Sequence, residues 1–399
     1  MHDRHWLSLE GLRLLACLML AFFLVFGFGL VWYSNFVAPN GYVISSDHVA
    51  FWEASKFALE GRAADAYDPA TFMAAAKQID AGKKNFGWFY PPTFFLAVLP
   101  LGLMSYFQSF LAFMVTTLAF YVASIRKIIR GSDAMLFLLA SPGLWLNLRM
   151  AQNGFLTAGV AGFALNTLKS RPIVSGVLIG LLSMKPHLAL LFPLALIANR
   201  SWKAFISAAI SAAIFLVVSI LVLGIDTLPA WIASLNQTRI MYLENPQVPI
   251  GMVSTFSMLR ILGAPLDASY LGQLITAAYA AAAVWKVWRS SASDNIKFSV
   301  LVIATLLVTP YLYFYDLTWL SLGIAWMAKS GLEEGWRTGD REVLAAAWLL
   351  PLVSYLTIWI HLLALLQLGI LLLLIVALRR AGYTVLLRKR RHVVFLQPR

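Results

Sequence analysis

The chain is a series of apolar segments separated by short stretches of charged residues, proline and glycine. The first long segment, 14–37, could cross a bilayer core of about 30 Å. Over the whole chain 60% of residues are hydrophobic and 12% are charged, whereas a soluble domain carries about 25% charged residues. The pattern therefore predicts an all-α fold, a polytopic bundle of transmembrane helices in the inner (cell) membrane.

Most of the apolar segments are predicted to cross the membrane as single helices, although several are shorter than the usual span of about 20 residues. The segment 92–104 lies between Pro91-Pro92 and Pro100, so we expect a re-entrant or interfacial helix there. About twelve crossings remain, with a range of about ten to thirteen. The apolar segments are 12–37, 92–104, 106–125, 133–148, 154–169, 172–183, 187–199, 202–224, 268–290, 296–311, 316–329, 342–360 and 361–380.

The basic residues predict the orientation of the chain. The net charge is +13, and membrane proteins concentrate Lys and Arg in cytoplasmic loops, so the charge indicates topology rather than a nucleic-acid partner. With both termini in the cytoplasm, most basic residues fall in inner loops, and 38–91 and 225–267 become extracytoplasmic loops. The first outer loop is expected to contain helices at 47–59 and 69–79, the second with Asp68 as its N-cap. Residues 1–399 are expected to form one membrane domain whose first helix is retained.

Five groups of polar residues are predicted to lie on the extracytoplasmic side. Each group also has an ordinary interpretation. Lysine can extend its ammonium to lipid headgroups, tyrosines can form an interfacial belt, and polar residues can cap helices. The histidines can be hydrogen-bonded interfacial residues, and Arg149 can be a headgroup anchor. The convergence of all five groups on one face favours a site. The groups are Asp47; 85–92; Asn147, Arg149, Gln152 and Asn153; Lys185 and His187; and Tyr311, Tyr313, Tyr315 and Asp316.

Motifs for metals and nucleotide cofactors are absent from the sequence. There is no H-E-x-x-H motif, no P-loop and a single cysteine, Cys17, which leaves no thiolate cluster and no internal disulfide. The pair Asp65 and Asp68 is a weak candidate for a metal site because it lies in a turn-rich loop. We therefore expect no cofactor and no required metal.

The polar groups, in this order, resemble glycosyltransferase family 87, a group of integral-membrane enzymes. The resemblance covers about residues 10–330 and rests on several short motifs rather than one long one. It implies a GT-C fold and a sugar donor carried on a polyprenyl phosphate, as in mannosyltransferases. The motifs are 46–52, 61–68, Phe89-Tyr90-Pro91-Pro92 with Pro100-Leu101, Gln152-Asn153-Gly154, Gly176 to Gly180 leading to Lys185-Pro186, and Pro310-Tyr311 with Tyr315-Asp316.

The resemblance also implies a general base in the first outer loop, and this role carries over to Asp47. Some family members have a histidine in the region where this chain has Tyr315-Asp316, a departure that leaves the sugar and the acceptor open. The residue chemistry is consistent with this role. A carboxylate can accept the proton of an acceptor hydroxyl that attacks the anomeric carbon with inversion.

The remaining substrate-binding residues follow from the charge of the leaving group. A lipid phosphate needs cationic donors, for which Lys185 is the first candidate, followed by Arg149, Arg239 and Arg260 because arginine binds phosphate with two N–H groups. Aromatic rings could contact the sugar, and we consider Trp52, Trp88, Tyr90 and Tyr311. The expected substrate-binding set is Tyr90, Arg149, Gln152, Asn153, Lys185, His187, Arg239, Tyr311, Tyr315 and Asp316.

Two other classes of protein fit the composition. A solute transporter would have charged or Gly/Pro-broken helices near the middle of the membrane and access from both sides. A flippase for lipid-linked sugars, or a structural membrane protein, would need no base. The favoured hypothesis is a glycosyltransferase that moves a mannose-like hexose from a polyprenyl-phosphate donor to a lipid or glycan acceptor on the extracytoplasmic face.

Overall fold

The computed structural model describes residues 7–34, 47–79, 87–245, 251–356 and 364–383, and in this part of the chain the regular structure is helical. The predicted all-α class is confirmed. The described residues contain no strand, only an isolated bridge between Met252 and Tyr313. The C-terminal basic residues 388–391 and the stretches 38–46, 80–86 and 246–250 of the two predicted outer loops lie outside the described residues.

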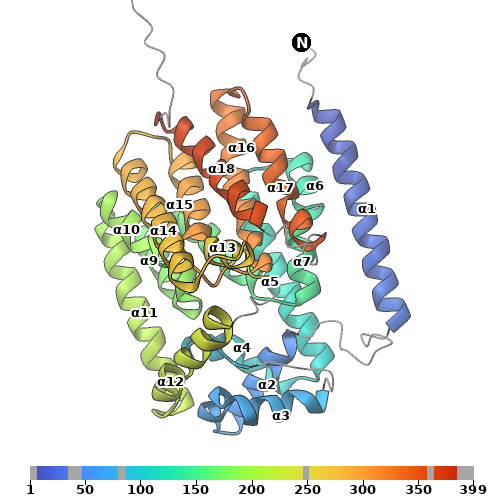
Figure 1. Ribbon diagram of the computed structural model, residues 1–399, viewed down its shortest axis with the longest axis vertical. Helices are drawn as coiled ribbons and strands as arrows, with labels where there is room; N and C mark the ends of the chain where they lie inside the picture. Colours follow the sequence, from blue (N-terminus) through green and yellow to red (C-terminus); the bar gives the residue numbers. More distant parts are fainter. Residues whose placement is uncertain (1–6, 35–46, 80–86, 246–250, 357–363, 384–399) are drawn as a thin grey trace, which may run out of the picture.

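Most of the helices form a bundle along the long axis of the molecule, with α1 at its edge (Figure 1). The last helix of the bundle runs back toward the end from which α1 starts. The helices are α1 (Leu9–Ser34), α5 (Tyr106–Ile128), α6 (Ser132–Leu139), α7 (Pro142–Met150), α8 (Gly154–Thr167), α9 (Pro172–Leu181), α10 (Leu191–Ala198), α11 (Trp202–Leu223), α14 (Leu266–Arg289), α15 (Asp294–Val308), α16 (Leu320–Glu334), α17 (Asp340–Leu356) and α18 (Ala364–Arg380).

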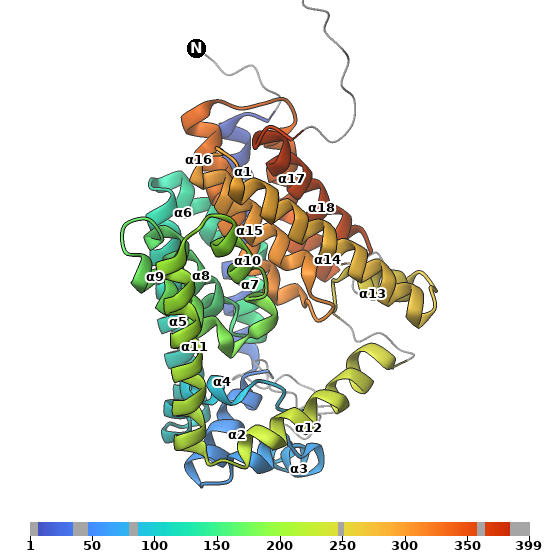
Figure 2. The ribbon, with the colours of Figure 1, turned by 90° about the vertical axis from the view of Figure 1, so that its left-hand side faces the viewer.

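Short helices lie across the opposite end of the bundle, which is the lower end in Figures 1 and 2. The two helices expected in the first predicted outer loop are present, and the Asp68 carboxylate accepts a hydrogen bond from the Thr71 N–H at 2.8 Å, as predicted for an N-cap. The short elements there are α2 (His48–Leu59), η1 (Ala63–Tyr67), α3 (Pro69–Ile79), α4 (Pro92–Val98), η2 (Leu99–Leu103), α12 (Thr227–Arg239) and the π-helical turn η5 (Ile240–Glu244). The short helix α13 (Thr255–Ile261) lies higher in Figure 2, against α14 and α18.

Two of the described helices, α5 and α11, are long and apolar enough to cross a membrane. Shorter apolar stretches occur at 92–103, 172–184 and 186–198. The number of crossings, about twelve, and the GT-C type of the bundle stay predictions.

The expected single helix over 133–148 is wrong. The chain forms two helices there, α6 and α7, which are separated at Ser141-Pro142. Proline lacks an N–H and its ring clashes with the preceding turn, so it begins a new helix instead of continuing the old one.

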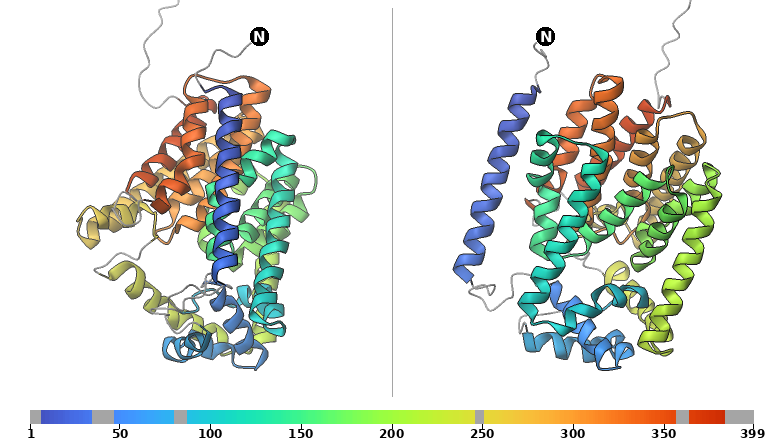
Figure 3. Two further views of the ribbon diagram at one scale, coloured as in Figure 1. Left: turned by 90° about the vertical axis from the view of Figure 1, so that its right-hand side faces the viewer. Right: turned by 180° about the vertical axis from the view of Figure 1, so that it is seen from behind.

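The loops predicted to be cytoplasmic gather at one end of the bundle, away from α2 and α3 (Figures 1 and 3). Hydrogen bonds and ion pairs join these loops to one another. Lys169 pairs with Asp294 at 2.5 Å, and the Asn295 Nδ2 group donates to Glu333 at 2.9 Å. We call the end of the bundle that carries these basic loops the loop end, and the opposite end, toward α2 and α3, the site end. That the loop end faces the cytoplasm stays a prediction.

Close packing of α9 against α11 directs the chain toward the opposite end. A Cβ atom on Gly176 would lie 2.4 Å from the Ala204 carbonyl oxygen, and one on Gly180 would lie 2.6 Å from the Ser211 Cβ. The Ser211 hydroxyl donates to the Val177 carbonyl at 3.1 Å. Small residues at four-residue spacing let two helix backbones approach this closely, and this contact holds the helix that leads to Lys185.

Candidate functional site

A tight turn between α7 and α8 supplies the centre of the polar cluster. Ala151 has a left-handed backbone with φ of +52°. Asn147, which is fully buried, donates to the Gln152 carbonyl at 3.1 Å and accepts from the Gly154 N–H at 3.0 Å. A Cβ atom on Gly154 would lie 2.5 Å from the Asn147 Oδ1 atom, so glycine is needed there. The turn therefore presents Gln152 and Asn153 in a defined position.

Gln152 connects Asp47 to Tyr90. The Gln152 Nε2 group donates to the Asp47 carboxylate at 3.1 Å, while the Gln152 Oε1 atom accepts from the Tyr90 hydroxyl at 3.1 Å. The backbone N–H of Asn153 also donates to Oε1, at 3.3 Å. Because two donors meet the amide oxygen, the amide NH₂ group must face Asp47. Asp47 begins α2 without a capping hydrogen bond from its side chain, and its carboxylate is held by Gln152 instead.

Lys185 lies where the helical chain is interrupted, between η3 (Leu182–Met184) and η4 (Pro186–Leu188). Its side chain is 4% exposed, so its ammonium is inside the protein and not at the surface. The Nζ atom donates to the Asn153 Oδ1 atom at 3.0 Å and to the Asp316 carboxylate at 2.5 Å. It also lies 5.1 Å from the centre of the Tyr315 ring. A lysine has three N–H donors, and two are used in these hydrogen bonds.

Asp316 belongs to η6 (Phe314–Trp319), which joins α15 to α16. Its second carboxylate oxygen accepts from the Tyr313 N–H at 3.4 Å. Asp316 therefore caps a helical turn, as its ordinary interpretation predicted, and it also pairs with a cation. The hydrogen-bonded cluster is continuous. Gln152 contacts Asp47; Asn153, the next residue in the chain, contacts Lys185; and Lys185 contacts Asp316.

Tyrosines from two loops pack beside this cluster. The rings of Tyr313 and Tyr315 are stacked with centroids 5.4 Å apart, and Tyr242 contacts Tyr313 at 6.1 Å. Burial, and then the nearby Asp47 carboxylate, raise the pKa of Tyr242, so this phenol stays neutral near the carboxylate. Tyr242 was outside the expected set, because a single tyrosine in a long loop carries no sequence signal that separates it from an interfacial belt.

Of the expected set, Arg239, Tyr311 and His187 lie outside the hydrogen-bonded cluster of the described residues, and Tyr315 contacts Lys185 through its ring. Arg239 is exposed and pairs with Glu244 at 3.2 Å. Tyr311 packs in a separate apolar cluster with Met252 and Phe256. Arg149 lies in the last turn of α7, and His187 follows Lys185 by two residues, with its Nε2 atom buried and without a hydrogen-bond partner among the described residues.

The other candidates for sugar or phosphate contact are used elsewhere. The Trp52 indole donates to the Met104 carbonyl at 2.9 Å, and Trp88 is buried and stacked on Phe94. The Arg260 guanidinium donates to the Ala264 carbonyl at 3.1 Å. Each of these three side chains therefore has a neighbour outside the polar cluster.

His48, next to Asp47, is a packed residue of the loop helix α2. It is fully buried, and its Nε2 atom lies 2.8 Å from the Ser109 hydroxyl. Burial lowers the pKa of His48 to about 4, so the ring is neutral at pH 7. This agrees with the ordinary interpretation of His48 as a hydrogen-bonded residue.

In the part of the chain that the structure describes, His, Cys, Asp and Glu side chains do not form a group of three that could hold a metal ion. The cluster offers the half-buried Asp47 carboxylate, the buried Lys185 ammonium paired with the buried Asp316 carboxylate, and several neutral hydrogen-bonding groups. Such a set can move a proton at Asp47 and stabilise negative charge at Lys185.

Comparison with known proteins gives one match. The model of glycosyltransferase family 87 matches residues 88–310, which is more than half of the chain and includes Tyr90, Gln152, Asn153 and Lys185. No curated protein and no solved structure matches the chain. The resemblance seen in the short motifs is therefore confirmed by the family model, and the chain belongs to glycosyltransferase family 87.

Proposed function

We propose that this glycosyltransferase moves a mannose-like hexose from a polyprenyl-phosphate donor to a hydroxyl of a lipid or glycan acceptor. The reaction takes place on the extracytoplasmic face of the membrane and inverts the anomeric carbon. Membership of the family supports sugar transfer in general. The observation that carries the proposal is the hydrogen-bonded path from Asp47 through Gln152 and Asn153 to Lys185.

Asp47 acts as the general base. The acceptor oxygen forms a bond to the anomeric carbon as its proton passes to the Asp47 carboxylate. The bond from the anomeric carbon to the phosphate oxygen breaks, and its electron pair stays on the departing polyprenyl phosphate. Gln152 keeps the carboxylate oriented, because its amide donates to one carboxylate oxygen at 3.1 Å.

Lys185 stabilises the phosphate. Its ammonium is buried, where an ionic interaction is stronger than in water, and it has an N–H donor beyond the two bonds to Asn153 and Asp316. Tyr90 and Tyr315 lie beside this path and supply neutral hydroxyl and ring surfaces to the sugar. Arg149, close to Gln152 in the chain, and His187, close to Lys185, are proposed to contact the donor.

The test is a transfer assay in membranes that carry the wild type, Asp47→Asn or Asp226→Asn, supplied with radiolabelled polyprenyl-phosphate mannose and other hexose donors. We expect Asp47→Asn to lower transfer by about 10²- to 10⁴-fold because the base is lost. Asp226, an exposed acid just before α12, is the matched control and should leave transfer near the wild-type rate. The anomeric configuration of the product, measured by NMR, should be opposite to that of the donor.

Equal transfer by the wild type and Asp47→Asn would contradict the base assignment. A wild type that transfers no hexose from any polyprenyl-phosphate donor would contradict the proposed donor and favour the transporter or flippase alternatives.

A further inference from the structure

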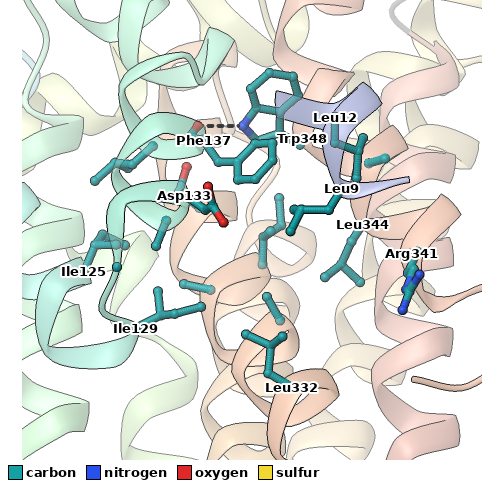
Figure 4. A pocket seen from close by; sticks show the side chains of 18 of the residues that line it. Leu9, Leu12, Ile125, Ile129, Asp133, Phe137, Leu332, Arg341, Leu344 and Trp348 are labelled. Carbon is teal, nitrogen blue, oxygen red and sulfur yellow. Dashed lines mark hydrogen bonds between the residues drawn. The ribbon is translucent and has the colours of Figure 1, made fainter. Parts of the chain in front are cut away.

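A cavity of about 540 Å³ lies at the loop end of the bundle, away from the polar cluster. It is bordered by α1, the end of α5, α6, α16 and α17, and its volume falls in the range of about 300–1,000 Å³ that small-molecule sites have. Figure 4 shows the side chains that surround it, including the Trp348 indole that donates to the Phe137 carbonyl at 2.9 Å. The lining is mainly apolar and includes Leu9, Leu12, Ile129, Phe137, Leu332 and Trp348.

The position of α1 explains why space remains there. This helix stands at the edge of the bundle in Figure 1 and in the right panel of Figure 3. Near its start, Arg13 binds Asp133 through two hydrogen bonds of 2.8 and 2.7 Å. The polar pair holds α1 next to α6, while the leucines beside it border the cavity instead of filling it.

The charged residues at the cavity favour an anion. The lining contains two arginines, Arg130 and Arg341, and a single acid, Asp133, which Arg13 already binds. The Arg341 guanidinium lies 5.3 Å from the centre of the Trp336 ring. The helices α6 and α17 also begin at this cavity, and the N-terminus of a helix carries partial positive charge. A mainly apolar cavity next to positive charge is complementary to a lipid with an anionic headgroup.

We propose that this cavity binds one anionic glycerophospholipid, with an acyl chain between α1 and α16–α17 and its phosphate near Arg130 and Arg341. The lipid completes the contact between α1 and the bundle. This site is separate from Asp47 and Lys185, and it rests on the chain lying in a membrane, not on the transfer reaction.

The experiment is a lipid titration of the detergent-purified full chain, followed by native mass spectrometry. The probes are phosphatidylglycerol, zwitterionic phosphatidylcholine and a polyprenyl phosphate. We expect one tightly retained phosphatidylglycerol. Ala328→Trp, which places an indole in the cavity, should remove it, whereas Ala282→Trp on the exposed side of α14 should not.

Arginine variants test the headgroup without filling the cavity. Arg130→Ala and Arg341→Ala should each weaken phosphatidylglycerol binding by about fivefold and leave phosphatidylcholine binding unchanged. Lys203→Ala, an exposed cation at the start of α11, is the matched control and should have no effect. Transfer activity measured on the same samples distinguishes failure of this proposal from failure of the proposed function.

Three results would overturn the proposal. The first is equal binding of phosphatidylglycerol and phosphatidylcholine, and the second is unchanged binding by Ala328→Trp. The third is a polyprenyl phosphate that binds more tightly than phosphatidylglycerol and is lost in Ala328→Trp, which would assign the cavity to the donor lipid.

Discussion

Two buried ion pairs lie at opposite ends of the bundle, and they differ in the groups that surround the cation. At the loop end, Asp340 binds Arg380, whose guanidinium also donates to the Ser330 hydroxyl at 3.0 Å and the Gly335 carbonyl at 2.6 Å. At the site end, Asp316 binds Lys185, which makes one further hydrogen bond, to Asn153.

The difference separates a pair that joins two helices from a pair that belongs to the candidate site. All three guanidinium nitrogens of Arg380 have partners within the protein, and Asp340 also binds Arg379, so this pair belongs to a network that joins α17 to α18. Lys185 makes two hydrogen bonds to described residues and lies in a network that reaches Asp47. Burying a charge is costly unless it is paired, and each of these cations has a buried carboxylate as its partner.

The largest expected effect comes from breaking each pair separately. Lys185→Met and Arg380→Met each leave a buried carboxylate with fewer partners and should lower the free energy of unfolding by about 3–5 kcal/mol, measured by thermal unfolding in detergent. Only Lys185→Met should abolish transfer per folded molecule, because only this cation is proposed to bind phosphate.

The double variant Lys185→Met/Asp316→Leu is the control for this comparison. Replacing a buried pair with apolar residues is often neutral for stability, so the double variant should recover folding without recovering transfer. Recovery of transfer would show that Lys185 is a structural residue like Arg380.

The next prediction concerns Gln152, which lies between the Asp47 carboxylate and the Lys185 ammonium in the network. Gln152→Leu should lower kcat by about 10- to 100-fold, which corresponds to one hydrogen bond to a charged group. Without the amide donor, the Asp47 carboxylate should also titrate at higher pH, so the acid limb of the pH–rate profile should move upward. A lower kcat with an unchanged pH profile would indicate that Gln152 only supports the turn between α7 and α8.

A smaller effect is expected on the stability of the site end at acidic pH. His48 has its pKa lowered to about 4 by burial, so between pH 6.5 and 4 the unfolded chain binds a proton that the folded chain does not. Stability should therefore fall on acidification from pH 7 to pH 5, on the order of 2 kcal/mol. Hydrogen exchange should show α2 losing protection before α18, and His48→Gln should remove most of the difference. Earlier loss of protection in α18 would contradict this order.

The smallest effect is expected at the exposed pair of the loop end. Lys169 and Asp294 are 76% and 34% exposed in their side chains, and exposed pairs contribute less than about 1 kcal/mol. Lys169→Ala should change neither thermal unfolding nor transfer beyond this amount. A larger loss of stability would mean that the loop end depends on its surface pairs as well as on Asp340.

The helices were largely predictable because their signals are local. The expected 69–79 matches α3, and the end of the apolar run at 202–224 lies next to the end of α11. The break between α6 and α7 was missed, although Pro142 marks it, because the apolar pattern continues through Ser141. Hydropathy alone does not record a break between two apolar helices.

The candidate site was predictable in part. Asp47, Tyr90, Gln152, Asn153, Lys185 and Asp316 were expected on one face, and they form one hydrogen-bonded cluster. Arg239 and Tyr311 were expected with them but have partners within their own surroundings, Glu244 for the arginine and an apolar cluster for the tyrosine. Their residue types suit phosphate and sugar, and only packing decides whether they are available.

The sequence by itself determined that this chain is helical and apolar, where most helices begin and end, and which family it resembles. These properties depend on hydrophobicity, proline and glycine acting over a few residues. The tertiary structure alone decided which polar groups touch. Gln152 and Asp47 are 105 residues apart in the chain, and Lys185 and Asp316 are 131 apart. Such contacts arise from how helices pack against one another, as α9 does on α11, and no local pattern specifies them.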